Sequence, residues 1–285
     1  SQGGSLVEWD LRSPGYNLLS TLARRPEAYH LMLQQKSSGQ NGADNVAIKS
    51  IHDGLRQRTE LPQTLSYDKY PRVSLIDHIL PLDLAMEDFI TGQYPESENW
   101  ASSVYQVDIK PDGQALALSF KREGQSWNKT PIQIEKVLKV SPSGSSLGEF
   151  EVVYTLTNTG TTQAEGLFGS EWNFNLLGGG HNPQAYYRLS DGKTDYLDSM
   201  AQEESIAKVY LGNRYLDIEL SLTTTPAARL WYFPVETVSN SEAGLEKSYQ
   251  ANCLLLLYRF SLQPSAILNI KLNWSAYSVP PQNQR

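Results

Sequence analysis

A short polar row in the sequence carries the residue types that recognise sugars. In the run Ser170–Leu176, the alternation of a β-strand sends Glu171, Asn173 and Asn175 to one face and apolar side chains to the other. One carboxylate and two amides offer donors and acceptors that match sugar hydroxyls. Because Glu and Asn are depleted in strands, this row favours a carbohydrate-contacting surface. The alternative is the solvated polar face that most sandwiches present outside.

The adjacent pair Asp77 and His78 is a second candidate, because it follows an apolar run and precedes Pro81 at a predicted strand end. Acid–base catalysis would need both groups at one substrate, whereas neighbours on a strand point to opposite faces. A structural role in hydrogen bonding is therefore the favoured interpretation, since buried Asp and His side chains are usually satisfied in this way.

Acidic side chains are plentiful, but no spacing singles out a catalytic pair. Retaining glycosidases need two carboxylates about 5 Å apart across the scissile bond. No signature marks a catalytic pair among the acids Glu8, Glu27, Asp77, Glu171, Glu242 and Glu246. The sequence therefore predicts no catalytic residue in this chain.

No metal or cofactor is expected from the sequence. The four histidines do not fall at zinc-ligand spacing, and the single Cys253 offers no thiolate cluster. The triplet Gly178-Gly179-Gly180 resembles a phosphate cradle only in composition, because the Lys and the helix of a P-loop are missing. A loop between strands is the expected structure there.

The composition is that of a folded protein, with 285 residues, 40% hydrophobic and 19% charged, and this length fits one sandwich domain over residues 1–285. The net charge of −7 argues against a nucleic-acid partner. No stretch of about 18 apolar residues is present that would span a membrane. The single Cys253 beside Leu254–Leu257 indicates a buried thiol and favours a cytoplasmic location.

Alternation of apolar and polar residues predicts antiparallel strands through most of the chain. The clearest runs are 115–120, 150–156, 215–222 and 267–272. The run Leu254–Leu257 is apolar on both faces, which predicts a central strand covered on both sides. The fold is therefore expected to be mainly β, as a large antiparallel β-sandwich.

The first hundred residues are expected to differ from the rest. The segment Leu18–Ala23 has apolar residues at helical spacing, and Asp44–Arg58 can form another short helix. A Gly/Ser/Asn-rich stretch between them predicts a loop. We therefore expect residues 1–70 to combine a strand, helical pieces and loops at the start of the sandwich.

Four blocks of the sequence together resemble a known family. In chain order they are Gly3–His30, Arg72–His78, Ser170–Leu176 and Ser239–Gln250. They are similar to the C-terminal β-domain of glycoside hydrolase family 57 enzymes, the α-amylase and 4-α-glucanotransferase relatives. The resemblance implies a galactose mutarotase-like supersandwich and an upstream catalytic barrel in the same polypeptide. It also implies that this chain is a non-catalytic part of an enzyme acting on an α-glucan or maltooligosaccharide.

The resemblance assigns roles to the charged residues as well. Both catalytic carboxylates of the resembled family belong to the barrel, so none of the acids here inherits that role. The charged group Arg24, Arg25, Glu27 and His30 is predicted to dock against the barrel. The candidate carbohydrate contacts are Glu171, Asn173, Asn175, Asp77, His78, His181 and Glu242.

Two alternative functions stay open at this point. The first is an independent carbohydrate-binding module that uses the row at Glu171. The second is an aldose epimerase, because such relatives of the fold use a His and a Glu to move the ring protons. His78, His181 and Glu242 stand in a suitable order, although no epimerase motif surrounds them, and a shared fold does not carry an activity.

Overall fold

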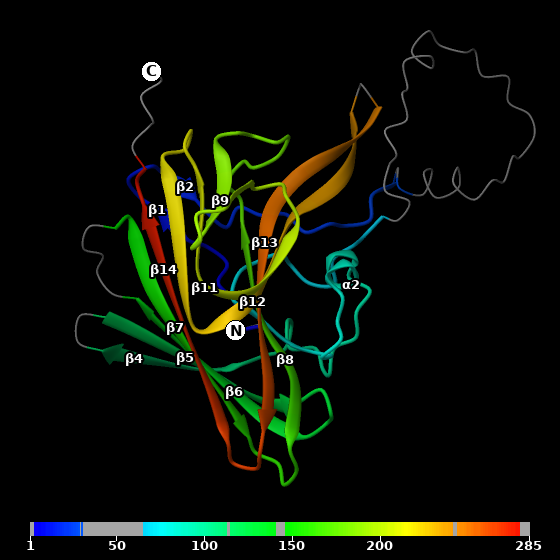
Figure 1. Ribbon diagram of the computed structural model, residues 1–285, viewed down its shortest axis with the longest axis vertical. Helices are drawn as coiled ribbons and strands as arrows, with labels where there is room; N and C mark the ends of the chain where they lie inside the picture. The colour runs from blue at the N-terminus through cyan, green and yellow to red at the C-terminus, as the bar shows by residue number, and fades with distance from the viewer. Residues whose placement is uncertain are drawn as a thin grey trace, which may run out of the picture.

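The computed structural model describes residues 3–28, 30, 65–112, 115–140, 146–241 and 244–279. In that part of the chain, twelve strands form one curled antiparallel sheet and two short strands form a separate hairpin (Figure 1). The hairpin consists of β1 (Asp10–Leu11) and β2 (Tyr16–Asn17). The strands of the sheet are β3 (Ile76–Leu80), β4 (Gln106–Asp112), β5 (Ala115–Gln125), β6 (Pro131–Val140), β7 (Gly148–Asn158), β8 (Ala164–Phe174), β9 (Ala185–Leu189), β10 (Thr194–Tyr196), β11 (Ala201–Asn213), β12 (Ile218–Ser241), β13 (Gly244–Leu262) and β14 (Ile267–Tyr277).

The long strand β12 divides the sheet into two layers that face each other. Its first half pairs with β14, which continues through β7, β6 and β5 to β4, while its second half pairs with β13, which continues through β8 to β3. Trp172 on β8 lies 6.0 Å from Phe150 on β7 and 5.1 Å from Trp274 on β14, measured between ring centroids. The core therefore lies between the two layers, and the predicted β-sandwich is confirmed.

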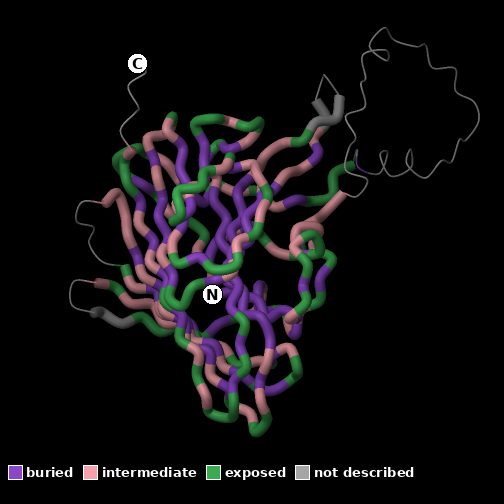
Figure 2. Tube along the Cα trace, in the orientation of Figure 1, coloured by how far each residue is buried: buried purple, intermediate pink, exposed green. Residues whose placement is uncertain are grey.

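Alternation along the strands explains which side chains enter this core. Phe150, Val152 and Tyr154 of β7 are buried, whereas the residues between them are partly exposed. The central strand expected at Leu254–Leu257 is confirmed, because β13 lies between β12 and β8 and all four leucines are buried. Figure 2 shows the buried positions running through the middle of the molecule.

A third layer covers the outer face of β3, β8 and β13. It contains the helix α2 (Met86–Thr91), which lies beside these strands in Figure 1. The side chains of Leu84, Phe89 and Tyr94 pack on Leu255 and Leu257 of β13. Acidic residues in the first turn suit the helix dipole. Gly92 ends the helix in the left-handed conformation, at φ 73°.

The helix predicted at Leu18–Ala23 is wrong. These residues form a turn followed by residues without regular secondary structure, and the Asn17 Oδ1 accepts a hydrogen bond of 2.9 Å from the backbone N–H of Leu19 in the turn. The backbone of Leu18 bonds to other segments, since its N–H donates to the Trp9 oxygen at 3.0 Å and its oxygen accepts from the Asn175 N–H at 2.9 Å. The other predicted helix, Asp44–Arg58, lies outside the described residues.

Candidate functional site: two buried ionic networks and a surface hollow

The polar row of β8 lies beneath the third layer. Glu171 and Asn173 point to the outer face of the strand, as alternation predicts, but both are fully buried. Asn175, just after the strand, is partly exposed and donates a 2.9 Å hydrogen bond to the backbone oxygen of Ser20. The row thus meets protein instead of solvent, which departs from the sugar-facing surface expected of it.

Glu171 is the centre of a network that we call the outer network. Its members are Arg24, Asp68, Tyr70, Arg72, His78, Glu96, Glu171 and Asn173. Oε1 of Glu171 accepts hydrogen bonds from Arg72 Nη1 at 2.9 Å and from Asn173 Nδ2 at 2.7 Å. Oε2 accepts from Tyr70 Oη at 2.6 Å and lies 2.9 Å from His78 Nε2. Two strong donors on each oxygen leave this carboxylate fully satisfied.

The other charges of the outer network alternate in sign. Nδ1 of His78 lies 2.8 Å from a carboxylate oxygen of Glu96. Asp68 binds two cations, since its Oδ1 lies 2.7 Å from Nη2 of both Arg72 and Arg24. This alternation compensates the cost of removing each charge from water.

Electrostatics fixes the protonation states of the central pair. Burial alone would raise the pKa of Glu171, but the charge of Arg72 and the hydrogen bond and charge of His78 outweigh it and lower this pKa to about 2. Burial would likewise lower the pKa of His78, but Glu96 and Glu171 raise it to about 9. Both groups are therefore charged at neutral pH. A general acid or base works best with a pKa near the operating pH, which neither group has.

A small recess adjoins the outer network. It is lined by Asp68, Lys69, Tyr70, Arg72, Phe89, Gly92 and Tyr94 and has a volume of about 10 Å³. This is room for one water molecule at most. A sugar cannot reach Glu171 or His78 through it.

Asp77 belongs to a second, inner network on the opposite face of β3. Its Oδ2 lies 2.8 Å from Nζ of Lys136 and accepts a 2.7 Å hydrogen bond from Tyr105 Oη, while Oδ1 accepts one of 2.9 Å from Tyr154 Oη. Burial lowers the pKa of Lys136, although Asp77 opposes this shift. The neighbours Asp77 and His78 thus serve different networks, and each is held by hydrogen bonds.

The remaining predicted site residues lie apart from these networks. His181 is exposed, in the turn after β8, and its Nδ1 lies 3.1 Å from Asp198. Glu242 lies outside the described residues. Among the described candidates, His78 is ion-paired with Glu171 in the interior and lies apart from the exposed His181.

The predicted docking group is divided between the surface and the interior. Arg25 and Glu27 are exposed. Arg24 and His30 are buried, where Arg24 pairs with Asp68 and His30 Nε2 lies 3.1 Å from the backbone oxygen of Val238. These two residues attach the N-terminal segment to the fold and are not available to a second domain.

Sequence reasoning missed several members of both networks. Lys136 was detectable, because it takes an inward position on β6 between Ile134 and Leu138. Arg72 lies in one of the four blocks that carry the family resemblance, and Asp68 precedes it by four residues. Nothing in the sequence marks Glu96, whose place depends on how the third layer folds back.

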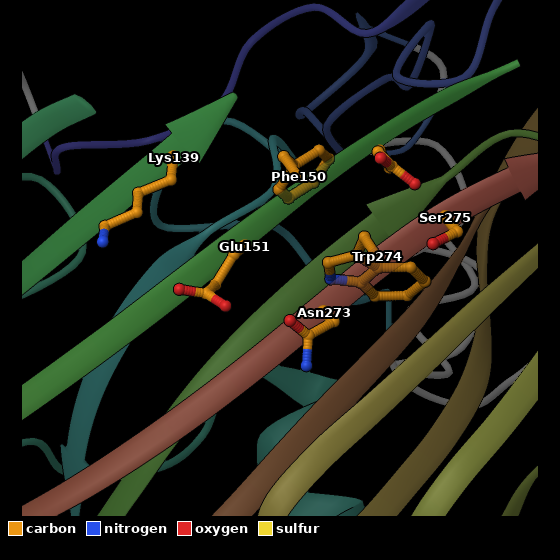
Figure 3. A pocket seen from close by; sticks show the side chains of 7 residues that line it. Lys139, Phe150, Glu151, Asn273, Trp274 and Ser275 are labelled. Atoms are coloured by element: carbon orange, nitrogen blue, oxygen red, sulfur yellow. The ribbon is translucent and has the colours of Figure 1, made fainter. Parts of the chain in front are cut away.

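A hollow of about 260 Å³ lies on the outer face of β6, β7 and β14 (Figure 3). Its lining residues are Lys139, Glu149, Phe150, Glu151, Asn273, Trp274 and Ser275. Glu151 lies opposite Lys139 on one side and Asn273 on the other, and each of these three is partly exposed. The hollow therefore presents a cation, a carboxylate and an amide on three neighbouring strands.

Comparison with known proteins identifies the family. Residues 1–272 match the family described as "Alpha-amylase/4-alpha-glucanotransferase, C-terminal". The chain belongs to this family. It is 29% identical over 265 residues to alpha-amylase 1 of Dictyoglomus thermophilum, covering 92% of this chain and 36% of that protein. It is 26% identical over 257 residues to the 4-alpha-glucanotransferase of Thermococcus kodakarensis, covering 90% of this chain and 34% of that protein. The domain thus spans about a third of these relatives.

Solved structures agree with the family and with the fold. The 4-alpha-glucanotransferase of Thermococcus litoralis superimposes with a TM-score of 0.67 at 19% identity, over 96% of this chain and 34% of that one. A galactose mutarotase-like protein of Clostridium acetobutylicum gives a TM-score of 0.56 at 9% identity, over 98% of this chain and 91% of that one. The domain therefore has the galactose mutarotase-like fold.

Two further observations bear on the chemistry of the domain. Within the described residues, no group of three or more His, Cys, Asp or Glu side chains is placed to hold a metal ion. No helix there is both long and apolar enough to cross a membrane.

Proposed function

We propose that the domain is the non-catalytic C-terminal part of a family 57 enzyme that hydrolyses α-glucans or transfers glucanosyl units. The catalytic barrel would lie upstream in the same polypeptide, and the substrate would be an α-glucan or maltooligosaccharide. The cytoplasmic location expected from the single buried cysteine belongs to the same proposal.

One observation carries the proposal. The ionisable candidate residues on β3 and β8, namely Asp77, His78 and Glu171, are all bound to opposite charges in buried networks. The pKa values of about 2 for Glu171 and about 9 for His78 leave neither group able to exchange a proton readily at neutral pH. A domain with this arrangement contributes structure, while the family match supplies the enzyme class.

The test compares this chain with the full-length gene product. Hydrolysis of maltoheptaose and transfer between maltooligosaccharides are measured for both at equal molar concentration. We expect turnover by the full-length protein and none above the blank by this chain. Turnover by the chain that persists through repeated purification would contradict the proposal, and so would a full-length protein with no activity on these sugars.

A second candidate function is carbohydrate binding at the hollow of β6, β7 and β14. Lys139, Glu151 and Asn273 offer both donors and acceptors to sugar hydroxyls, and the volume of about 260 Å³ accommodates part of a sugar chain. Calorimetric titration of the chain with maltoheptaose tests this function. Heat of binding that saturates supports it, whereas no heat at millimolar sugar contradicts it.

A further inference from the structure

The inner face of the sheet continues beyond the core at the end formed by β4, β5 and β6. Five apolar side chains make up this region, which we call the apolar overhang: Val107, Ile109, Leu116, Leu118 and Val140. Register places Ile109 opposite Leu118, and Leu116 opposite Val140. All five lie on the face that, further along the same strands, supplies Phe120 and Leu138 to the core.

Four side chains of the apolar overhang are exposed, whereas Leu118 packs partly against the core formed with the opposite layer. Within the described residues, β3 is the last strand of the layer that contains β8 and β13, and β4 is the last strand of the layer that contains β5 and β6. The exposed fractions are 62% for Ile109, 44% for Leu116, 43% for Val107 and 42% for Val140. Single exposed apolar residues are ordinary, but neighbours in register on one face mark a surface that is covered in the working protein.

The first described residues contact Phe120, which pairs with Val107 of the apolar overhang. The backbone N–H of Gly3 donates a 2.7 Å hydrogen bond to the oxygen of Ser103, three residues before β4. A Cβ atom added to Gly4 would lie 3.2 Å from Cδ1 of Phe120 on β5. Polypeptide joined at this end of the described fold would therefore begin within reach of this surface.

The size of the relatives indicates what such a polypeptide is. The chain covers 36% of the Dictyoglomus alpha-amylase 1 and 34% of the Thermococcus 4-alpha-glucanotransferase. We propose that the apolar overhang is the surface on which the catalytic part of the same polypeptide docks, through an apolar surface of its own. This proposal rests on the proposed function. It also moves the docking site away from Arg24 and His30, which are buried within the domain.

The test uses two isoleucines that are almost equally exposed in the domain, Ile109 at 62% and Ile267 at 56%. Ile267 begins β14 and lies outside the apolar overhang. Full-length proteins carrying Ile109→Cys or Ile267→Cys are treated with a thiol reagent, and labelling at each introduced site is followed by peptide mass spectrometry. The same measurement on the urea-unfolded proteins gives the labelling rate of each thiol when no folded structure covers it. Because both side chains are largely exposed in the domain, neither substitution removes core packing.

We expect the thiol introduced at position 109 to react at least tenfold more slowly than the thiol introduced at position 267 in the folded protein. The two should react alike when the proteins are unfolded. Equal rates in the folded protein would overturn the docking proposal. Protection at position 109 that disappears on dilution would also overturn it, because the cover would then be a second copy of the protein.

Activity on maltoheptaose, measured in the same samples, separates this proposal from the proposed function. An active Ile109→Cys protein whose introduced thiol is unprotected refutes only the docking surface. An inactive protein whose introduced thiol is protected refutes only the proposed function.

Discussion

The two faces of β3 carry buried ion pairs that respond to burial in opposite ways. On the inner face, Lys136 has one carboxylate partner, Asp77, and burial lowers the pKa of its ammonium group. On the outer face, His78 lies between two carboxylates, and its pKa is raised to about 9. The number of opposite charges around a buried group thus decides whether desolvation prevails.

The same difference gives the two networks opposite dependences on pH. The folded pKa of His78 lies above its ordinary value of 6.5, so its stabilisation is complete below about pH 6.5 and is lost as the pH rises through about 9. The folded pKa of Lys136 lies below its ordinary value of 10.5, so stability that depends on Lys136 increases as the pH rises toward that value. A variant that removes one network therefore leaves the pH dependence of stability that comes from the other network.

The largest effect is expected from Arg72→Met. Loss of this guanidinium leaves Glu171 and Asp68 buried with one cation fewer, which should lower the free energy of unfolding by about 4 kcal/mol. Urea denaturation at pH 7 measures the change. Arg25→Met is the matched control, because Arg25 is exposed, and it should change stability by less than about 0.5 kcal/mol. Equal effects of the two variants would mean that the outer network contributes nothing specific.

His78→Gln should have the next largest effect, and the effect should depend on pH. At pH 6 the loss should be about 3 kcal/mol, because Glu171 and Glu96 lose a shared cation. The loss should shrink between about pH 6.5 and 9, because over this range the unfolded chain gives up the proton of His78 while the folded protein still holds it. Urea denaturation at half-unit pH steps checks both points. His181→Gln, at an exposed position, is the control. A loss that stays constant from pH 6 to 9 would show that His78 is not the titrating group.

Asp77→Asn should cost less, about 2 kcal/mol at pH 7, because Lys136 can give up its proton and keep its hydrogen bonds to two backbone oxygens. Urea denaturation at pH 7 and at about pH 9 measures the loss. It should become smaller at the higher pH, because removing the proton from a buried amine costs less as the pH approaches its ordinary pKa. Asp83→Asn, at an exposed position, controls for the change of net charge. A loss that grows with pH would contradict the assignment of a weakly compensated Lys136.

Asn273→Ala should change stability by less than about 0.5 kcal/mol, since Asn273 is partly exposed on the outer face of β14. If the hollow binds sugar, the same variant should weaken maltoheptaose binding about fivefold, the expected result of losing one hydrogen bond. Calorimetric titration measures the affinity. Asn269→Ala, at another outward position of the same strand, is the matched control. Equal affinity of both variants for maltoheptaose would mean that the sugar does not bind in the hollow.

The sequence predicted the strands well and the surroundings of their side chains poorly. Alternation depends only on neighbouring residues, so the inward positions of β7 and β14 were readable, and the apolar run Leu254–Leu257 marked the central strand. The helix prediction at Leu18–Ala23 failed because the backbone of Leu18 bonds to Trp9 and to the distant Asn175, which a local pattern does not record.

The candidate site shows why the surroundings of the side chains could not be predicted from the sequence. Alternation placed Glu171 and Asn173 on one face of β8, but whether that face meets water depends on residues about a hundred positions earlier. Arg72 reaches Glu171 across 99 positions of sequence. No local pattern records that a third layer covers the outer face. The sequence therefore predicts an exposed surface at Glu171 and Asn173, whereas both side chains are buried.

We expect Glu171 to support the structure and to perform no chemistry. The most direct test is Glu171→Gln in the full-length protein, with kcat for maltoheptaose measured at a temperature where the variant is folded, together with Tm. We predict kcat within about threefold of the wild type and a clear fall in Tm, because general acid–base catalysis would contribute at least about a hundredfold. A fall in kcat of about a hundredfold or more with an unchanged Tm would contradict the account.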